Sequence, residues 1–152
     1  MSHFIKLGLQ KDIEVQLSKN NVDYKQNIVF VVNDCKGDLD SGEGSHWSLL
    51  VYERASNTWY HMDSNNGYNE PHAKQIIGKV NNYLASIGSL LNLRTKYIES
   101  HCTQQTNGYD CGPLMILFAR NTAKKIIRVE PLHTYLVNKL KQLTSESGYM
   151  TS

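Results

Sequence analysis

Strand-like runs of hydrophobic residues occupy much of the first half of the chain. Residues 27–34 form a continuous run of β-branched and aromatic side chains, which predicts a buried strand. Residues 46–56 and 57–67 predict two more strands, and the short polar connection between them predicts a hairpin. A fourth strand is predicted over residues 93–100.

Helical spacing of apolar residues is clearest between residues 70 and 88. Pro71 near the start of this segment and Gly88 near its end stand where helices begin and stop. The apolar positions that recur every three or four residues are Ile76, Ile77, Val80, Tyr83, Leu84 and Ile87. The other predicted helices cover residues 12–19, 110–126 and 130–146. Pro113 falls in the first turn of the helix predicted over 110–126, where proline is tolerated.

The order of these elements predicts the fold class. Strands are followed by a helix, a strand and further helices, which is typical of an α+β domain. We therefore expect a central mixed or antiparallel sheet packed against the helix that begins at Cys111. Between the first two strands, residues 35–45 contain three glycines and several acids, which predicts a flexible surface loop.

Length and composition indicate a single globular domain over residues 1–152. The chain is 40% hydrophobic and 20% charged, which is ordinary for a globular protein. Its net charge of +2 is too small to indicate nucleic acid as a partner. The three cysteines are irregularly spaced, so they predict neither a disulfide framework nor a zinc site, and no metal or other cofactor is expected.

The distribution of charge also bears on the expected compartment. Residues 1–30 carry charges that a signal peptide would not have, at Lys6, Lys11, Asp12, Glu14 and Lys19. No apolar segment reaches the length of a membrane span, so no membrane partner is expected. With free cysteines favouring a reducing environment, we expect the cytoplasm, the nucleus or both.

Cys111 is the first candidate for chemistry, because it stands between an acid and a glycine where a helix is predicted to begin. A thiol in the first turn of a helix lies at the positive end of the helix dipole, which favours the thiolate and hence a nucleophile. The alternative interpretation is a small buried core residue, as most free cysteines are.

A cysteine nucleophile usually needs a base, and the base needs a group that orients it. His46 opens the second predicted strand and Asp63 closes the third. Because opposite ends of paired antiparallel strands meet, we expect these two side chains to lie at one end of the hairpin. Taken singly, they could be a loop-facing histidine and a turn-capping aspartate.

Gln105, six residues before Cys111, is a candidate donor to the oxyanion that acyl transfer creates, together with the backbone N–H of Cys111. Alone, it could equally be a solvated loop residue. His61 shares a strand face with Asp63 and is an alternative base. The remaining histidines are weaker candidates, and they are His3, His72, His101 and His133.

Four segments carry a resemblance to a known family, in the order "GSHWSLLVYE", "YHMDSN", "HAKQI" and "QQTNGYDCG". Together they resemble the ubiquitin-like-protein-specific cysteine proteases, and within them the deneddylase, or sentrin-specific protease 8, branch. The resemblance implies an α+β papain-like fold with His46 as base, Asp63 as its orienter and Cys111 as nucleophile. It also implies Gln105 as the oxyanion donor and Trp47 as a cover over the substrate's Gly-Gly tail.

The resemblance further implies a ubiquitin-like modifier and its conjugates as partners, with the protease acting as a monomer. Deneddylation is the favoured activity, whereas activity on SUMO, on ubiquitin or on an acetyl group stays open as an alternative.

Family members normally have more chain before "HFIKL", including a "WLND" motif, so we expect a catalytic domain without that N-terminal helical segment. The alternative function is a truncated relative that binds the modifier without efficient cleavage. A third is an interaction domain whose cysteine is inert.

Overall fold

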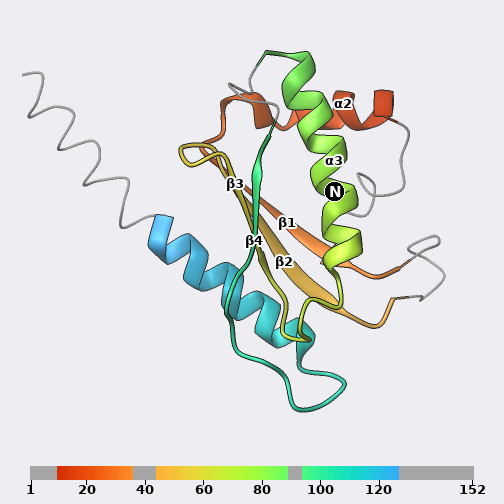
Figure 1. Ribbon diagram of the computed structural model, residues 1–152, viewed down its shortest axis with the longest axis vertical. Helices are drawn as coiled ribbons and strands as arrows, with labels where there is room; N and C mark the ends of the chain where they lie inside the picture. The colour runs from red at the N-terminus through yellow and green to blue at the C-terminus, as the bar shows by residue number, and fades with distance from the viewer. Residues whose placement is uncertain (1–9, 36–43, 89–93, 127–152) are drawn as a thin grey trace, which may run out of the picture. The chain divides into compact units, whose positions relative to one another are not determined.

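A computed structural model describes residues 10–35, 44–88 and 94–126 (Figure 1). In chain order its elements are α2 (Gln10–Lys19), the short 3-10 helix η1 (Val22–Tyr24), β1 (Asn27–Asn33), β2 (Trp47–Glu53), β3 (Thr58–Met62), α3 (Glu70–Ser86) and β4 (Lys96–Glu99). A further helix covers residues 111–126 and is called the 111–126 helix below. Each of these elements except η1 was predicted from the sequence, with boundaries that differ by up to five residues.

The chain divides into two compact units, Met1–Phe118 and Ala119–Ser152. The first holds the sheet, α2, α3 and the start of the 111–126 helix, and the described part of the second is residues 119–126, which are helical. The predicted helix over 130–146 and most of the predicted loop over 35–45 lie outside the described residues. The single domain over 1–152 stays a prediction. Within the described residues, no helix is both long and apolar enough to cross a membrane.

The four strands form one mixed sheet in the order β1-β2-β3-β4. The first three are antiparallel neighbours, and β4 runs parallel to β3. The tight turn between β2 and β3 has Asn57 at a φ of 51°, a left-handed conformation that asparagine tolerates. The parallel β3–β4 pair needs a long crossover, and α3 supplies it.

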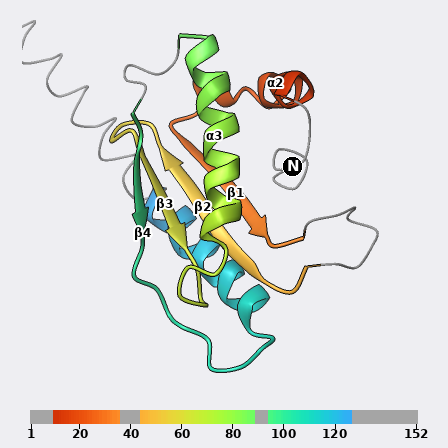
Figure 2. The ribbon, with the colours of Figure 1, turned by 45° about the vertical axis from the view of Figure 1, so that its right-hand side comes forward.

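The hydrophobic core lies between one face of the sheet and the helices α2 and α3 (Figure 2). Alternate residues of β1 enter it, as the two-residue period of a strand requires. The apolar stripe of α3 enters it through Ala73, Ile76, Val80, Tyr83 and Leu84. Trp59 is fully buried there and donates its indole N–H to the Asn81 side chain at 3.1 Å.

One expectation about the strands needs correction. The continuous apolar run over 27–34 predicts a buried strand, but β1 is buried mainly on one face. Val29 is 46% exposed, while its neighbours Ile28 and Phe30 are buried. The reason is that Ile28 and Phe30 point to the face that packs with α2 and α3, whereas Val29 points to the opposite face.

The topology gathers several chain segments at one end of the sheet. The end of β1 pairs with the start of β2, since Asn33 lies opposite Trp47. β3 finishes at the same end of the sheet, since Met62 lies opposite Leu49. The residues that follow β1 and β3, and those that precede β2, therefore meet there.

Candidate active site

His46 and Asp63 are in direct contact at this end of the sheet. The Nε2 atom of His46 lies 2.5 Å from Oδ1 of Asp63, and both residues are buried, at 3% and 1% exposure. His46 comes immediately before β2 and Asp63 immediately after β3. The hairpin thus brings together the two residues that the sequence placed at its end.

The Asp63 carboxylate is held in one orientation by three donors. Its Oδ1 atom accepts from His46 and from the backbone N–H of Asn65 at 2.9 Å. Its Oδ2 atom accepts from the backbone N–H of Asn69 at 2.8 Å. Asn69 is the N-cap of α3, where backbone N–H groups lack intrahelical acceptors. The carboxylate therefore sits at the positive end of a helix.

The backbone of His46 is fixed by residues that the sequence analysis did not single out. Asp34 accepts the His46 N–H at 2.9 Å, and it also accepts the N–H and the hydroxyl of Ser45. The side-chain amides of Asn33 and Asn69 donate to the His46 carbonyl oxygen at 3.0 and 3.3 Å. The backbone of His46 is therefore held by Asn33 of β1 and by Asn69, the N-cap of α3.

Asp34 is charged in this arrangement. Burial raises the pKa of its carboxyl, but the hydrogen bonds from His46 and Ser45 outweigh burial, so the pKa is lowered below its ordinary value. Gly44 precedes this cluster with a φ of +110°, and a Cβ there would lie 2.3 Å from Oδ1 of Asn33. Only glycine fits at that position, in both conformation and space.

Two partly exposed aromatic residues are neighbours of His46, Tyr68 in space and Trp47 in the sequence. The ring of Tyr68 meets the imidazole edge-on at a centroid distance of 5.5 Å, and Tyr68 is 54% exposed. Trp47, the first residue of β2, is 38% exposed although its strand is otherwise largely buried. The exposed indole of Trp47, the residue after His46, has an apolar surface that is open to solvent.

Cys111 is the first residue of the 111–126 helix. The first backbone bond of that helix joins the Leu114 N–H to the Asp110 carbonyl at 2.9 Å. The loop that leads into it is shaped by Asn107, whose side chain accepts the N–H of Asp110 at 3.0 Å and donates to its carboxylate at 2.8 Å. Cys111 thus sits where backbone N–H groups have no intrahelical acceptor.

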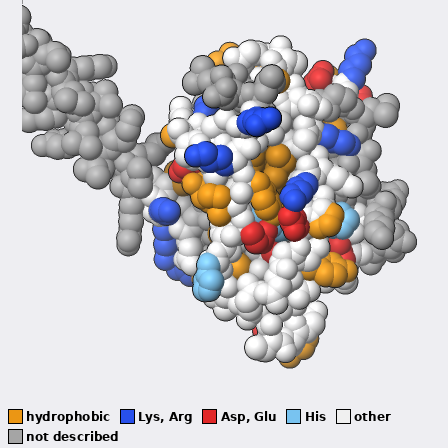
Figure 3. Space-filling model, viewed as in Figure 1, with side chains coloured by type: hydrophobic (Ala, Val, Ile, Leu, Met, Phe, Trp, Pro, Cys, Tyr) orange, Lys and Arg blue, Asp and Glu red, His pale blue; other side chains and the backbone are white. Residues whose placement is uncertain are grey.

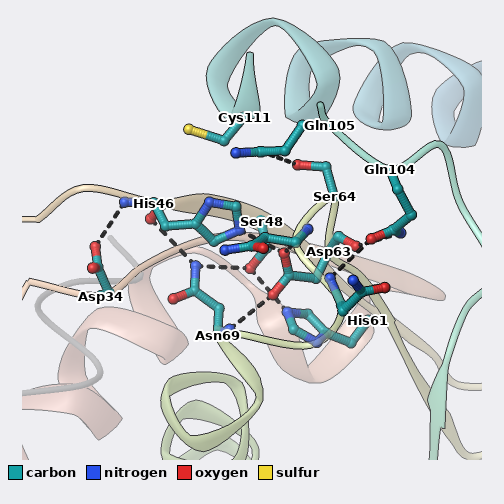
Figure 4. A network of polar contacts seen from close by, with 12 residues as sticks. Asp34, His46, Ser48, His61, Asp63, Ser64, Asn69, Gln104, Gln105 and Cys111 are labelled. Atoms are coloured by element: carbon teal, nitrogen blue, oxygen red, sulfur yellow. Dashed lines mark hydrogen bonds and ion pairs between the residues drawn. The ribbon is translucent and has the colours of Figure 1, made fainter. Parts of the chain in front are cut away.

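The thiol of Cys111 lies close to the chain just before His46. Its Sγ atom is 3.8 Å from the carbonyl oxygen of Ser45, the residue before His46. Figure 4 shows Cys111 and Gln105 on one side of the imidazole, with Asp63 on the other. Among the described residues, the recorded hydrogen bond of the thiol is this one to Ser45 and not one to His46.

Gln105 occupies the loop that faces the Asp63–Asn66 turn. Its side-chain oxygen accepts from the Ser64 hydroxyl at 2.8 Å, and its side-chain nitrogen donates to the Asn107 carbonyl at 2.8 Å. Figure 4 shows the amide nitrogen turned toward Cys111. The structure therefore brings together all four residues that the sequence assigned to the chemistry.

His61, the alternative base, is bonded elsewhere. It shares a face with Asp63 as predicted, but Nε2 lies 2.9 Å from the Ser48 hydroxyl and Nδ1 lies 2.8 Å from Glu99. Both ring nitrogens are thus engaged inside the sheet, away from Cys111. Of the weaker histidine candidates, His3 and His133 lie outside the described residues.

The two other cysteines are poorly suited to attack. Cys35 is 1% exposed. Cys102 is half-buried, and burial raises the pKa of its thiol, with the charges of Asp63 and Glu99 adding to the rise. A raised pKa leaves less thiolate at neutral pH, so Cys102 is a weaker nucleophile than an ordinary cysteine.

Charged side chains of both signs lie over the middle of the face in Figure 3. In the described part of that face, lysine and arginine side chains are interspersed with acidic and apolar ones.

Comparison with known sequences gives a family. The pattern of the Ulp1 protease family, C-terminal catalytic domain, matches residues 39–139. Sentrin-specific protease 8 of Rattus norvegicus is 31% identical over 132 residues, which is 86% of this chain and 58% of the relative. NEDD8-specific protease 1 of Arabidopsis thaliana is 38% identical over 102 residues, which is 66% of this chain and 42% of the relative. The chain thus spans about half the length of these relatives.

Comparison with solved structures gives the fold. The C-terminal Ulp1 protease domain in complex with Smt3, the yeast ortholog of SUMO, matches with a TM-score of 0.57 at 18% identity. The match covers 79% of this chain and 52% of that one. Ulp1 with its catalytic cysteine oxidised to a sulfonic acid matches with a TM-score of 0.56 at 20% identity. The α+β papain-like fold predicted from the sequence is confirmed.

Proposed function

Because this chain belongs to the Ulp1 protease family, we propose that it is a cysteine protease that removes or processes a ubiquitin-like modifier. The observation that carries the proposal is the buried His46–Asp63 contact beside a cysteine at the start of a helix. NEDD8 is the modifier we favour, since relatives that are 31% and 38% identical to this chain are named sentrin-specific protease 8 and NEDD8-specific protease 1. The proposal treats residues 1–152 as one catalytic domain.

In this mechanism, His46 is the base. Its Nε2–H donates to Asp63, so the proton-free nitrogen is Nδ1, which can take the proton of the Cys111 thiol. The thiolate attacks the carbonyl carbon of the modifier's last residue. His46 then gives its proton to the leaving amine, and a thioester remains on Cys111. Water, activated by the same imidazole, hydrolyses the thioester and frees both the modifier and the enzyme.

The oxyanion formed in each step needs donors. We assign this role to the Gln105 side-chain amide and to the Cys111 backbone N–H, which has no acceptor within its helix. Removing one oxyanion donor typically lowers kcat by about 10²–10³. Asp63 acts through His46, because it fixes the ring orientation and stabilises the imidazolium.

Substrate capture is assigned to Trp47. A Gly-Gly tail is narrow and conformationally free, so holding it extended costs more entropy than for other residues. The exposed Trp47 indole beside His46 offers a flat surface over such a tail. Glycines suit this position because the absence of side chains lets the tail lie under the ring.

The test is labelling by modifier probes. The protein is incubated with NEDD8, SUMO and ubiquitin, each carrying an electrophile in place of the C-terminal carboxylate, and the modified residue is identified by peptide mass spectrometry. We expect NEDD8 labelling at Cys111, and none in a Cys111→Ser variant. Binding of a modifier without labelling would favour the alternative, a relative that binds but does not cleave. Labelling at Cys102 would contradict the assignment.

A further inference from the structure

Ser64 links the His46–Asp63 pair of the candidate site to Gln105. It follows Asp63 directly and is 1% exposed. Its hydroxyl donates to the side-chain oxygen of Gln105 at 2.8 Å, and its carbonyl accepts the backbone N–H of Gln105 at 2.8 Å. The turn after β3 therefore orients the base through Asp63 and contacts the proposed oxyanion donor through Ser64.

The orientation of the Gln105 amide follows from its partners. The Asn107 carbonyl can only accept, so the amide end that faces it, at 2.8 Å, must be the NH₂ group. The oxygen end then faces Ser64, whose hydroxyl must donate. One N–H of the amide is used by Asn107, and the other is left for a substrate on the Cys111 side (Figure 4).

We propose that Ser64 is a positioning residue that keeps the Gln105 amide nitrogen toward the developing oxyanion. The inference rests on the proposed function. Without the hydroxyl, the amide oxygen loses the partner that the structure gives it, and only the bond from the amide nitrogen to the Asn107 carbonyl still opposes rotation of the group. A rotated amide presents its oxygen to the negatively charged intermediate, which replaces an attraction with a repulsion.

This role is separable from holding the loop together. The turn and the loop are also joined by the Gln105 N–H to the Ser64 carbonyl and by the Gln104 side chain to the Asp63 carbonyl at 3.0 Å. Asn66 adds a bond from its N–H to the Gln104 side chain at 2.9 Å. A Ser64→Ala change keeps all three of these contacts and removes only the hydroxyl bond to Gln105.

The first experiment is a double-mutant cycle. We measure kcat and KM of the parent, Ser64→Ala, Gln105→Ala and the double variant on a NEDD8 substrate with a fluorogenic C-terminal amide. We expect Ser64→Ala to lower kcat about tenfold with KM within about twofold, since the donor acts on the transition state. In the Gln105→Ala background the same change should have no further effect. Ser64→Thr retains a hydroxyl and should restore kcat.

Ser86→Ala is the matched control, because Ser86 also donates its hydroxyl within the fold, to the Tyr83 carbonyl at 2.8 Å, but at the far end of α3. It should leave kcat unchanged. Melting temperatures of all variants separate loss of fold from loss of positioning. Parent-like kcat in Ser64→Ala, or an equal loss in the presence and absence of Gln105, would overturn the inference.

A second readout does not depend on turnover. In ¹⁵N-labelled Cys111→Ser protein, the Gln105 side-chain amide pair should shift and exchange faster with solvent when Ser64→Ala is added, while the Asn107 side-chain pair stays in place. An unchanged Gln105 pair would refute the role of Ser64. Failure of the parent to cleave or to be labelled at Cys111 would instead refute the proposed function, whatever the amide signals show.

Discussion

His61 and Glu99 form a second histidine–carboxylate pair beneath the proposed one, with Nδ1 of His61 2.8 Å from Oε2 of Glu99. The other ring nitrogen meets Ser48, whose hydroxyl also accepts from the Asn69 amide at 3.1 Å. Asn69 in turn donates its backbone N–H to Asp63. A chain of hydrogen bonds thus runs from the proposed active site to β4.

This chain changes what is expected of His61. The sequence left His61 as an alternative base, but the residue is fully buried and its removal takes a hydrogen-bond partner from Ser48 and from Glu99. We expect a loss of about 1–3 kcal/mol in the free energy of unfolding, because the buried Ser48 hydroxyl loses a hydrogen-bond partner. Chemical denaturation measures it. Well-folded His61→Ala protein with parent stability would contradict the expectation, and loss of labelling at Cys111 in folded protein would point to His61 as base.

Replacing the nucleophile gives the second prediction. Cys111→Ser should lower kcat by at least about a thousandfold, since the hydroxyl is a far weaker nucleophile without full activation, and leave the melting temperature nearly unchanged. Cys102→Ser is the control and should keep most activity. The assignment fails if Cys102→Ser is inactive while Cys111→Ser still turns over.

A third prediction separates the base from the residue that orients it. His46→Ala removes the proton acceptor and should cost more in kcat/KM than Asp63→Asn, which keeps the side-chain shape. Asp63→Asn should also lower stability, because three donors surround the carboxylate and an amide offers only one oxygen. Steady-state kinetics and thermal melts of both variants test this. A larger kinetic loss in Asp63→Asn at equal folding would reverse the two roles.

The pKa of Asp34 gives a fourth prediction, which concerns pH. Its folded pKa lies below the ordinary 3.8, so the carboxylate form stabilises the folded state. That contribution is complete above about pH 4 and is lost as pH falls through the lowered pKa. We expect Asp34→Asn to melt below the parent at pH 7, with the gap closing toward pH 3. A gap that stays constant over this range would mean that the charge is irrelevant.

Trp47 provides the last prediction. Trp47→Ala should raise KM for a modifier substrate and slow probe labelling at least about tenfold, while a small thiol reagent should react with Cys111 at the parent rate. The reason is that a small reagent needs no cover over an extended tail. Trp59→Phe is a contrasting variant, since Trp59 is buried in the core and should affect stability instead. Equal slowing toward both reagents in Trp47→Ala would show that the indole supports the fold and not the substrate.

Much of this molecule could be predicted from its sequence, because the signals are local. Apolar residues that recur every two residues identify strands, and those that recur every three to four residues identify helices. Antiparallel pairing in a hairpin places His46, before one strand, beside Asp63, after the other. Cys111 could be placed at a helix start from its neighbours alone. These features depend on backbone geometry over short stretches, so they need no knowledge of distant contacts.

Only the tertiary structure decided what anchors these residues. Asn33, Asp34, Ser64 and Asn69 are residue types that occur in almost any turn, and nothing local distinguishes a turn former from a group that holds a base or an amide. Their contacts described above span from 6 to 41 residues along the chain. The exposed face of β1 and the engagement of His61 were likewise set by which elements became neighbours. Burial and hydrogen bonding are properties of the assembled fold, and a pattern along the chain carries them only where partners are close in sequence.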